Sequence, residues 1–247
     1  MGERLTATRW RTVAASVAGA GHVARGVGCE DASAVVVLDD GSVVVAVADG
    51  AGSACRAAEG SATAVSVVVD ALQEDPRAEL VDVVRLARAA LEPTEEELDA
   101  GLVLGDRATT LLVARLDGEE ITTAQIGDGA IVVRRCGRLE LLCPDERGEY
   151  LNETTFLTSA CWEDRLRVGG APARGVDAVA GMTDGLQLVA LDLATGAPHP
   201  PFFSPFFSFV AADGSADELC AFLGSERVTA RTDDDVTLAI AVRTSPE

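Results

Sequence analysis

The sequence predicts an α+β sandwich, in which antiparallel strands pack against helices, and not a doubly wound parallel sheet. Short valine-rich runs recur along the chain, and glycines or Asp-Gly pairs separate them. The links between later runs are too short for parallel crossovers. The helical patterns stand together as a block and do not alternate with single strands. Since 48% of the 247 residues are apolar, we expect residues 1–247 to form one domain with a sizeable core.

The N-terminal third predicts strands joined by tight turns. A first strand is expected at residues 13–17. Residues 33–38 and 42–48 are two further apolar runs, and Asp39-Asp40-Gly41 lies between them as a typical hairpin turn. The second of these strands leads directly into Asp49-Gly50.

Two helices are expected next, at residues 57–72 and 79–91, because their apolar residues recur at helical spacing. Pro93 interrupts that pattern. Strands are then predicted at 109–116, 121–126, 131–135 and 139–142, which we interpret as one meander. The remaining elements are a strand at 178–182, a helix at 215–222 that Ser215 and Glu218 open as a capping box, and a terminal strand at 236–242.

Composition excludes several kinds of chemistry. All 20 basic residues are arginine, so mechanisms that need a lysine are impossible, and two histidines, His22 and His199, nearly exclude a histidine-rich zinc site. A net charge of −20 argues against nucleic acid and anionic membranes as partners. The six cysteines form no CxxC pair and are expected to be reduced and mostly buried. Because no long apolar segment is present, we expect a cytoplasmic protein.

Acidic residues share one context, since each lies at the edge of an apolar strand. Carboxylates at strand ends converge easily on one rim of a sheet, where they repel one another unless a cation compensates. Hard oxygen ligands suit Mg²⁺ or Mn²⁺. Any one Asp-Gly pair is most often only a turn, but four such places make a metal site the better interpretation. They are Glu30-Asp31, Asp49-Gly50, Asp184-Gly185 and Asp233-Asp234-Asp235.

Six motifs together resemble the protein phosphatase 2C family of metal-dependent phosphatases. They follow the family's order and span residues 21–240, nearly the whole chain. The motifs are Gly21 to Gly26 leading to Cys29-Glu30-Asp31-Ala32, Val47-Ala48-Asp49-Gly50-Ala51-Gly52, Ala108-Thr109-Thr110, Ile126-Gly127-Asp128-Gly129, Met182-Thr183-Asp184-Gly185-Leu186 and Asp234-Asp235-Val236-Thr237.

The resemblance implies a four-layer α-β-β-α sandwich, with two antiparallel sheets face to face and helices outside. It also implies two Mn²⁺ or Mg²⁺ ions, with a possible third, weaker ion. The implied ligands are Asp49 bridging both ions, the Gly50 carbonyl, Asp184 and Asp234 on the first ion, Glu30 and Asp31 on the second largely through water, and Asp106 on the third.

The resemblance further implies hydrolysis of phosphoserine and phosphothreonine by a water that bridges the two ions. Arg25 is the candidate for gripping the phosphate, although its spacing to Glu30 is shifted by about one residue from the family pattern. His22 could donate to phosphate or act as an acid, or it could be an ordinary core or surface histidine. The role of Asp128 is expected to be mainly structural.

Several alternatives remain open at this point. The chain could keep the fold as an inactive regulatory or binding module, act as another two-metal hydrolase such as a nuclease, or be an acidic domain adapted to salt. The expected substrate is a phosphorylated protein, the target of a Ser/Thr kinase. Residues 144–175 replace the family's flap and either select the substrate or form a plain loop. The phenylalanines at 202–209 are expected in the core, with an interface or a lid as alternatives.

Overall fold

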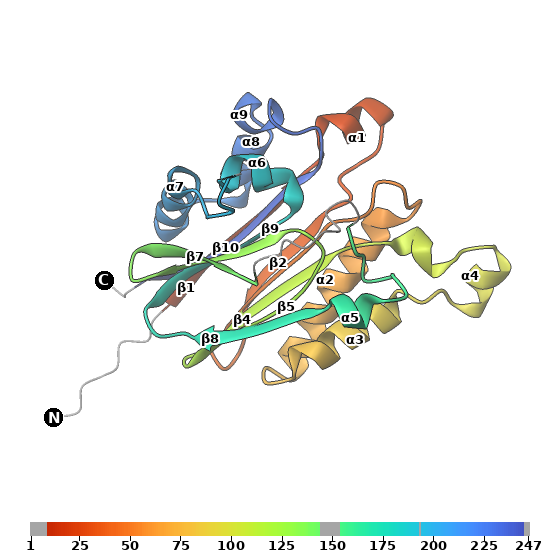
Figure 1. Cartoon of the computed structure of the whole chain (residues 1–247), viewed down its shortest axis with the longest axis horizontal. Helices are drawn as coiled ribbons and strands as arrows, with labels where there is room; N and C mark the ends of the chain where they lie inside the picture. The colour runs from red at the N-terminus through yellow and green to blue at the C-terminus, as the bar shows by residue number, and fades with distance from the viewer. Residues whose placement is uncertain (1–8, 144–153, 193, 245–247) are drawn as a thin grey trace.

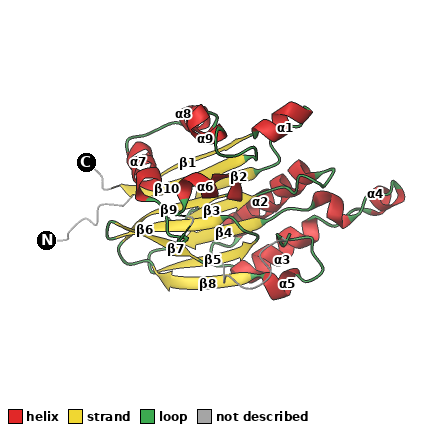
Figure 2. Ribbon diagram, turned by 45° about the horizontal axis from the view of Figure 1, so that its top comes forward, coloured by secondary structure: helices red, strands yellow, loops and turns green. Residues whose placement is uncertain are grey.

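A computed structural model describes residues 9–143, 154–192 and 194–244 (Figure 1). Two five-stranded antiparallel sheets pack face to face, and helices cover the outer face of each (Figure 2). The predicted four-layer sandwich is confirmed. None of the helices in these three ranges is long and apolar enough to cross a bilayer.

The first sheet contains the two ends of the described chain as neighbours. Its strand order is β1 (Arg9–Val17), β10 (Val236–Thr244), β9 (Val176–Met182), β6 (Ala130–Arg135) and β7 (Arg138–Leu142). The register pairs Val13 with Ile240 and Leu238 with Met182. In this register, the start of β10 lies beside the ends of β1 and β9. The acidic motifs lie at this end of the sheet.

The second sheet follows chain order except for its last strand. It contains β2 (Ala32–Val37), β3 (Val43–Ala48), β4 (Leu111–Leu116), β5 (Glu120–Ile126) and β8 (Arg167–Pro172). Every residue of β3 is buried. Val43, Val45 and Val47 face the other sheet, and Val44 and Ala46 face the helices. Burial on both faces explains why this strand is a continuous apolar run.

The expected meander across residues 109–142 is wrong in one respect. β4 and β5 belong to the second sheet, whereas β6 and β7 belong to the first. The chain changes sheets at Gly127-Asp128-Gly129, where Gly127 takes a φ of +100°. That conformation strongly favours glycine. The Gly-Asp-Gly turn therefore lets the chain pass from β5 in the second sheet to β6 in the first.

Two long helices cover the second sheet. They are α2 (Ala57–Glu74) and α3 (Leu80–Ala90), close to the predicted 57–72 and 79–91. Their buried residues form one apolar cluster with the outer face of β3 and β4.

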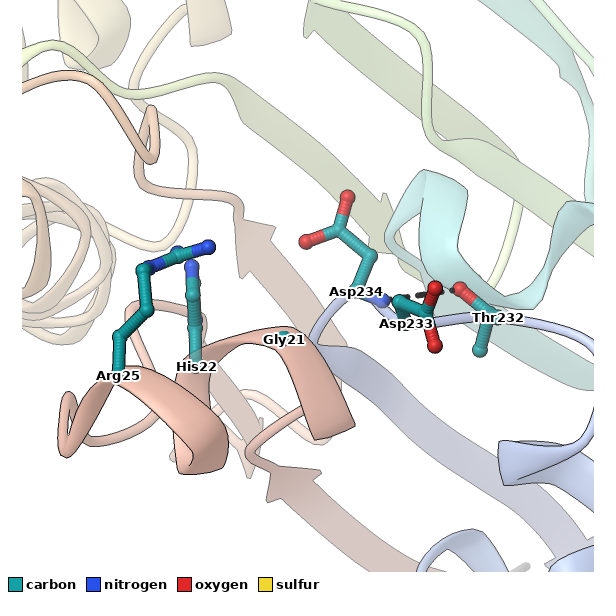
Figure 3. A pocket seen from close by; sticks show the side chains of 6 residues that line it. All are labelled: Gly21, His22, Arg25, Thr232, Asp233 and Asp234. Carbon is teal, nitrogen blue, oxygen red and sulfur yellow. Dashed lines mark hydrogen bonds between the residues drawn. The ribbon is translucent and has the colours of Figure 1, made fainter.

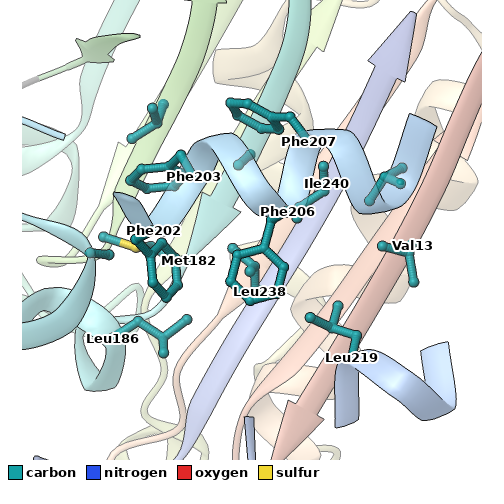
Figure 4. Packing of buried hydrophobic residues seen from close by; sticks show 14 of the residues in the cluster. Val13, Met182, Leu186, Phe202, Phe203, Phe206, Phe207, Leu219, Leu238 and Ile240 are labelled. Carbon is teal, nitrogen blue, oxygen red and sulfur yellow. The ribbon is translucent and has the colours of Figure 1, made fainter. Parts of the chain in front are cut away.

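The first sheet is covered by α7 (Pro200–Ala211) and α8 (Ala216–Leu223). The capping box of Ser215 and Glu218 is present, as predicted. α7 carries the phenylalanine cluster. Phe203 and Phe207 are 0% exposed and pack on the sheet together with Leu238 and Ile240 (Figure 4). The prediction that these phenylalanines belong to the core is confirmed for the buried members.

Short helical elements complete the described chain. They are α1 (Ala20–Arg25), α4 (Glu95–Asp99), η1 (Leu104–Arg107), α5 (Trp162–Arg165), η2 (Asp184–Leu186), α6 (Gln187–Ala190) and α9 (Glu226–Thr229).

The segment at 144–175 is only partly described, since residues 144–153 lie outside the described ranges. In the remainder, Leu157 is fully buried, and its N–H donates to the Thr109 carbonyl at 2.7 Å. The chain then forms α5 and β8. The described part of this segment is therefore part of the packed domain and more than a surface loop.

The cysteines differ from expectation in one way. All six are free, but none is fully buried: Cys55, Cys136 and Cys161 are exposed, and the other three are partly exposed. Cys136 lies in the turn between β6 and β7, and Cys143 follows β7. Turns and strand ends expose side chains that composition alone would assign to the core.

Candidate active site

The strand-edge acids meet at one end of the sandwich, where strands of both packed sheets begin or end. Asp49 follows β3, Asp184 follows β9, and Asp31 precedes β2. The carboxyl groups of Asp49 and Asp184 are within hydrogen-bonding reach of each other. Carboxyl groups from strands of both sheets therefore lie together, at the edge that the sequence predicted.

Asp31 connects the two sheets through its side chain. Its Oδ2 accepts hydrogen bonds from Thr183 Oγ1 at 2.8 Å and Thr237 Oγ1 at 2.7 Å. Thr183 follows β9 and Thr237 lies in β10, so one carboxylate of the second sheet is held by two strands of the first. Asp31 is thereby fixed beside Asp184, whose charge acts on it.

The crowding of these acids raises their pKa values. Burial, and then the charges of Asp31 and Asp184, raise the pKa of Asp49 to about 10. Burial raises the pKa of Asp31 to about 7, against the opposing effect of its two threonine hydrogen bonds. Burial and the neighbouring Asp128 raise the pKa of Asp184 to about 6. Without a cation, this group of carboxyls is not fully ionised at neutral pH.

Three buried carboxylate oxygens of the site have no hydrogen-bond partner in the described structure: Glu30 Oε2, Asp31 Oδ1 and Asp184 Oδ1. Unpaired buried oxygens of this kind are costly unless a cation or water satisfies them. Hard carboxylate oxygens are the donors that Mg²⁺ and Mn²⁺ prefer. The residues present therefore fit divalent ions.

The described side chains do not form a closed cage. No group of three His, Cys, Asp or Glu side chains in the described ranges could hold a metal ion by itself. Small divalent ions often bind through one or two carboxylates and keep several waters. An open arrangement of that kind is consistent with the cluster and would need water and backbone oxygens as further ligands.

The backbone around Asp49 is fixed by the Thr-Thr motif. The Asp49 N–H donates to Thr110 Oγ1 at 2.9 Å, and the Asp49 carbonyl accepts from the Thr110 N–H at 2.8 Å and from Thr109 Oγ1 at 3.0 Å. The next residue must be glycine, because a Cβ on Gly50 would lie 2.6 Å from the Glu30 carbonyl oxygen. Gly50 itself forms an isolated antiparallel bridge with Thr109.

Asp235 is a site residue that the sequence analysis did not single out. It is 3% exposed, and its carboxylate accepts hydrogen bonds from the N–H groups of Gly19 at 2.7 Å and Glu30 at 2.6 Å. It also contacts His22 Nδ1 at 2.8 Å. Asp235 therefore joins α1, the acidic pair and the last strand. The signal was its place beside Asp234, but two adjacent aspartates do not reveal which one turns inward.

His22 is buried, with 5% of its surface exposed, between two acids. Nδ1 contacts Asp235, and Nε2 lies 3.4 Å from Glu30 Oε2. His22 is thus neither a surface residue nor an apolar core residue. A pocket of about 330 Å³ opens beside it, with Arg25 and His22 rising from α1 on one side and Asp234 on the other (Figure 3).

The remaining candidates differ in position. Asp234 is exposed, accepts from the Asp235 N–H at 2.9 Å, and acts electrostatically on Asp49 and Asp184. Arg25 is exposed on α1, and its charge acts on Glu30. Asp106 lies in η1, where its carboxylate is engaged locally by the Val103 N–H at 2.9 Å and by the Cys55 thiol.

The family model described as "Protein phosphatase 2C" matches residues 18–224. The chain belongs to the protein phosphatase 2C family. The predicted family and the prediction of a protein phosphatase are confirmed.

A curated relative matches nearly the whole chain. "Serine/threonine-protein phosphatase 3" of Escherichia coli (strain K12) is 35% identical over 253 aligned positions, which cover 94% of this chain and 98% of the relative.

Solved structures share the fold at lower identity. The catalytic domain of the serine threonine protein phosphatase PstP in complex with two manganese ions is 19% identical, with a TM-score of 0.62, covering 95% of this chain and 98% of that one. The Mycobacterium tuberculosis phosphatase PstP/Ppp is 17% identical, with a TM-score of 0.65, covering 94% and 98%.

Proposed function

We propose that this protein removes phosphate from phosphoserine and phosphothreonine residues of other proteins, with two Mn²⁺ or Mg²⁺ ions at the acidic cluster. The observation that carries the proposal is the meeting of Asp49, Asp184 and Asp31, whose crowding raises their pKa values and leaves buried carboxylate oxygens unpaired. The E. coli relative, a serine/threonine-protein phosphatase, and the two manganese ions in the PstP structure support it.

The proposed ligands are those expected from the sequence. Asp49 would contact both ions, and the Gly50 carbonyl, Asp184 and Asp234 would complete the first. Glu30 and Asp31 would act on the second largely through water, and Asp106 would serve a third, weaker ion. When bound, the ions would lower the pKa of an attacking water and neutralise charge on the phosphoryl oxygens.

The protein's own residues would position these groups. The Thr109 and Thr110 contacts fix the Asp49 backbone. Two threonine hydroxyls hold Asp31 Oδ2, while Asp31 Oδ1 has no hydrogen-bond partner among the described residues. Asp235 contacts His22 at Nδ1, and this contact orients the ring so that Nε2 faces Glu30. We propose that Nε2 is the atom that carries a proton for the leaving oxygen.

Phosphate recognition is assigned to the small pocket beside α1. Arg25 contributes a guanidinium to a pocket whose other charged lining residues include Asp233 and Asp234. A phosphate dianion would be repelled there unless the ions and Arg25 offset the acids. This requirement explains why substrate binding should depend on metal.

The wider setting is also a proposal. We propose a signalling role in the cytoplasm on a protein phosphorylated by a Ser/Thr kinase. The net charge of −20 supports a protein substrate over nucleic acid.

The test is phosphate release from a phosphothreonine peptide with Mn²⁺, with Mg²⁺ and with EDTA. Asp184→Asn should lower kcat/KM by more than about 100-fold, since even second-shell changes at metal sites cost about 10- to 100-fold. Asp39→Asn is the matched control, because Asp39 is exposed in the β2–β3 turn. Undiminished turnover in EDTA would contradict the metal, and phosphopeptide binding without release would indicate an inactive module.

A further inference from the structure

A second and larger pocket lies on the helical layer over the first sheet. It has a volume of about 930 Å³, and α6, α7, α8 and α9 supply its walls. Volumes of this order are typical of small-molecule sites. The proposed phosphatase chemistry uses none of the residues that line it.

The walls of this pocket are mainly apolar and aromatic. Phe202 and Phe206 are each 8% exposed, whereas Phe203 and Phe207 on the same helix are fully buried against the sheet (Figure 4). The ring centroids of Phe206 and Phe222 are 5.0 Å apart in an edge arrangement, which joins α7 to α8. The main apolar lining residues are Leu188, Leu191, Phe202, Phe206, Phe209 and Phe222.

Two arginines at this pocket have no acidic partner among the described residues. Arg227 on α9 and Arg231 just after it are both exposed. Arg231 Nη1 donates to the Arg227 carbonyl at 3.0 Å, and in the described ranges neither guanidinium pairs with a carboxylate. Unpaired arginines are notable here, because the chain has 40 acidic residues against 20 arginines.

The acids that line the same pocket are already engaged. Asp192 Oδ1 accepts from the N–H groups of Ala194 at 3.0 Å and Thr195 at 2.8 Å and from the Thr195 hydroxyl at 2.9 Å. Glu218 accepts from the N–H and hydroxyl of Ser215 in the capping box of α8. His199, before α7, is the remaining titratable residue of the lining, and its charge acts on Asp192. The cationic groups are therefore the ones left to meet a ligand.

We propose that this pocket binds a small amphipathic anion, a molecule with an apolar chain or ring and one carboxylate or similar head. The phenylalanine-lined wall would take the apolar body, and Arg227 and Arg231 would take the anionic head. The ligand is a dissolved monomer and not a membrane surface, because the aromatic residues line a pocket and not a flat exposed face. The pocket lies along the segments that carry Asp184 and Asp234, since α6 follows η2 directly and Arg231 is three residues before Asp234.

The test is calorimetric titration of the full chain with monomeric dodecanoate, below its micellar concentration. We expect one saturable site per chain. The double variant Arg227→Gln/Arg231→Gln should bind at least about tenfold more weakly, since a charge-assisted contact is lost. Arg77→Gln, an exposed arginine between α2 and α3, is the matched control and should bind as the wild type does. Dodecyltrimethylammonium, with the same chain and a cationic head, should bind at least about tenfold more weakly than dodecanoate.

A second measurement places the ligand independently of the arginine variants. In methyl NMR spectra, dodecanoate should shift the signals of Leu188 and Leu191 and leave that of Leu72, in the opposite helical layer, unchanged. Absence of saturable binding, equal binding by the double variant, equal binding of the alkyl cation, or shifts confined to other residues would each overturn the proposal. Association with phosphatidylglycerol vesicles in place of monomeric dodecanoate would also overturn it.

Discussion

The acidic cluster makes the metal-free protein lose stability as pH rises, and Asp49→Asn should remove the largest part of that loss. The pKa of Asp49 is about 10 in the folded chain, against 3.8 for an unperturbed aspartate. Between these values, the folded state holds a proton that the unfolded state has released. The stabilising contribution is therefore complete below pH 3.8 and decreases continuously as pH rises toward 10.

The magnitude follows from proton linkage. One proton bound only by the folded state costs about 1.4 kcal/mol of unfolding free energy for each unit of rising pH. For a chain of this size, that corresponds to a fall in Tm of about 3 to 6 °C for each pH unit. Asn has nearly the shape of a protonated Asp but no titration, so the slope of Tm against pH in Asp49→Asn should be shallower by about this amount.

The assay is thermal unfolding from pH 6 to pH 8 in EDTA, repeated with saturating Mn²⁺. Asp39→Asn serves as the control, since its carboxylate is exposed in a turn. Mn²⁺ should flatten the wild-type slope, because the ions favour the ionised carboxylates. Equal slopes for the wild type and Asp49→Asn in EDTA would refute the electrostatic reasoning.

Two further substitutions test how the site is built. Asp235→Asn should destabilise the metal-free protein by about 2 kcal/mol in urea unfolding, because a buried N–H loses its carboxylate acceptor. The exposed Asp233→Asn should stay within about 0.5 kcal/mol, and equal effects of the two changes would contradict the role of Asp235. Gly185→Ala should cost about 3 kcal/mol and weaken Mn²⁺ binding, because its Cβ would lie 2.0 Å from the Asp235 carbonyl oxygen. A Cβ on Gly118 would meet nothing within 4 Å, so Gly118→Ala is the control and should have a normal melting temperature. A normal melting temperature for Gly185→Ala as well would contradict the packing argument.

Local patterns predicted the elements that have strong periodicity. The strands at β3 and β10 and the helices α2, α3 and α8 follow from apolar spacing and capping residues that act within a few residues of each other. The strand β8 was not predicted, because Gly169-Gly170 weakens its signal, and it is stable only as a neighbour of β5. Helix α7 was missed because Pro200, Pro201 and Pro205 obscured its helical spacing.

The same division applies to the site. Asp49 and Asp184 were predictable, because each ends an apolar strand at a glycine. Asp235 and the helix that carries His22 were not, since α1 is only six residues long and depends on contacts more than 200 positions away. The assignment of sheets to the strands at 109–142 failed for a similar reason, because sequence shows a turn at Gly127 but not the sheet to which the chain goes.

Calorimetric titration of the wild type and Asp49→Asn with Mn²⁺ measures whether the acidic cluster holds the ions. We expect two ions per wild-type chain and loss of both sites in Asp49→Asn, while Asp39→Asn binds as the wild type does. The same stoichiometry and affinity in Asp49→Asn would show that this group of carboxylates does not hold the ions.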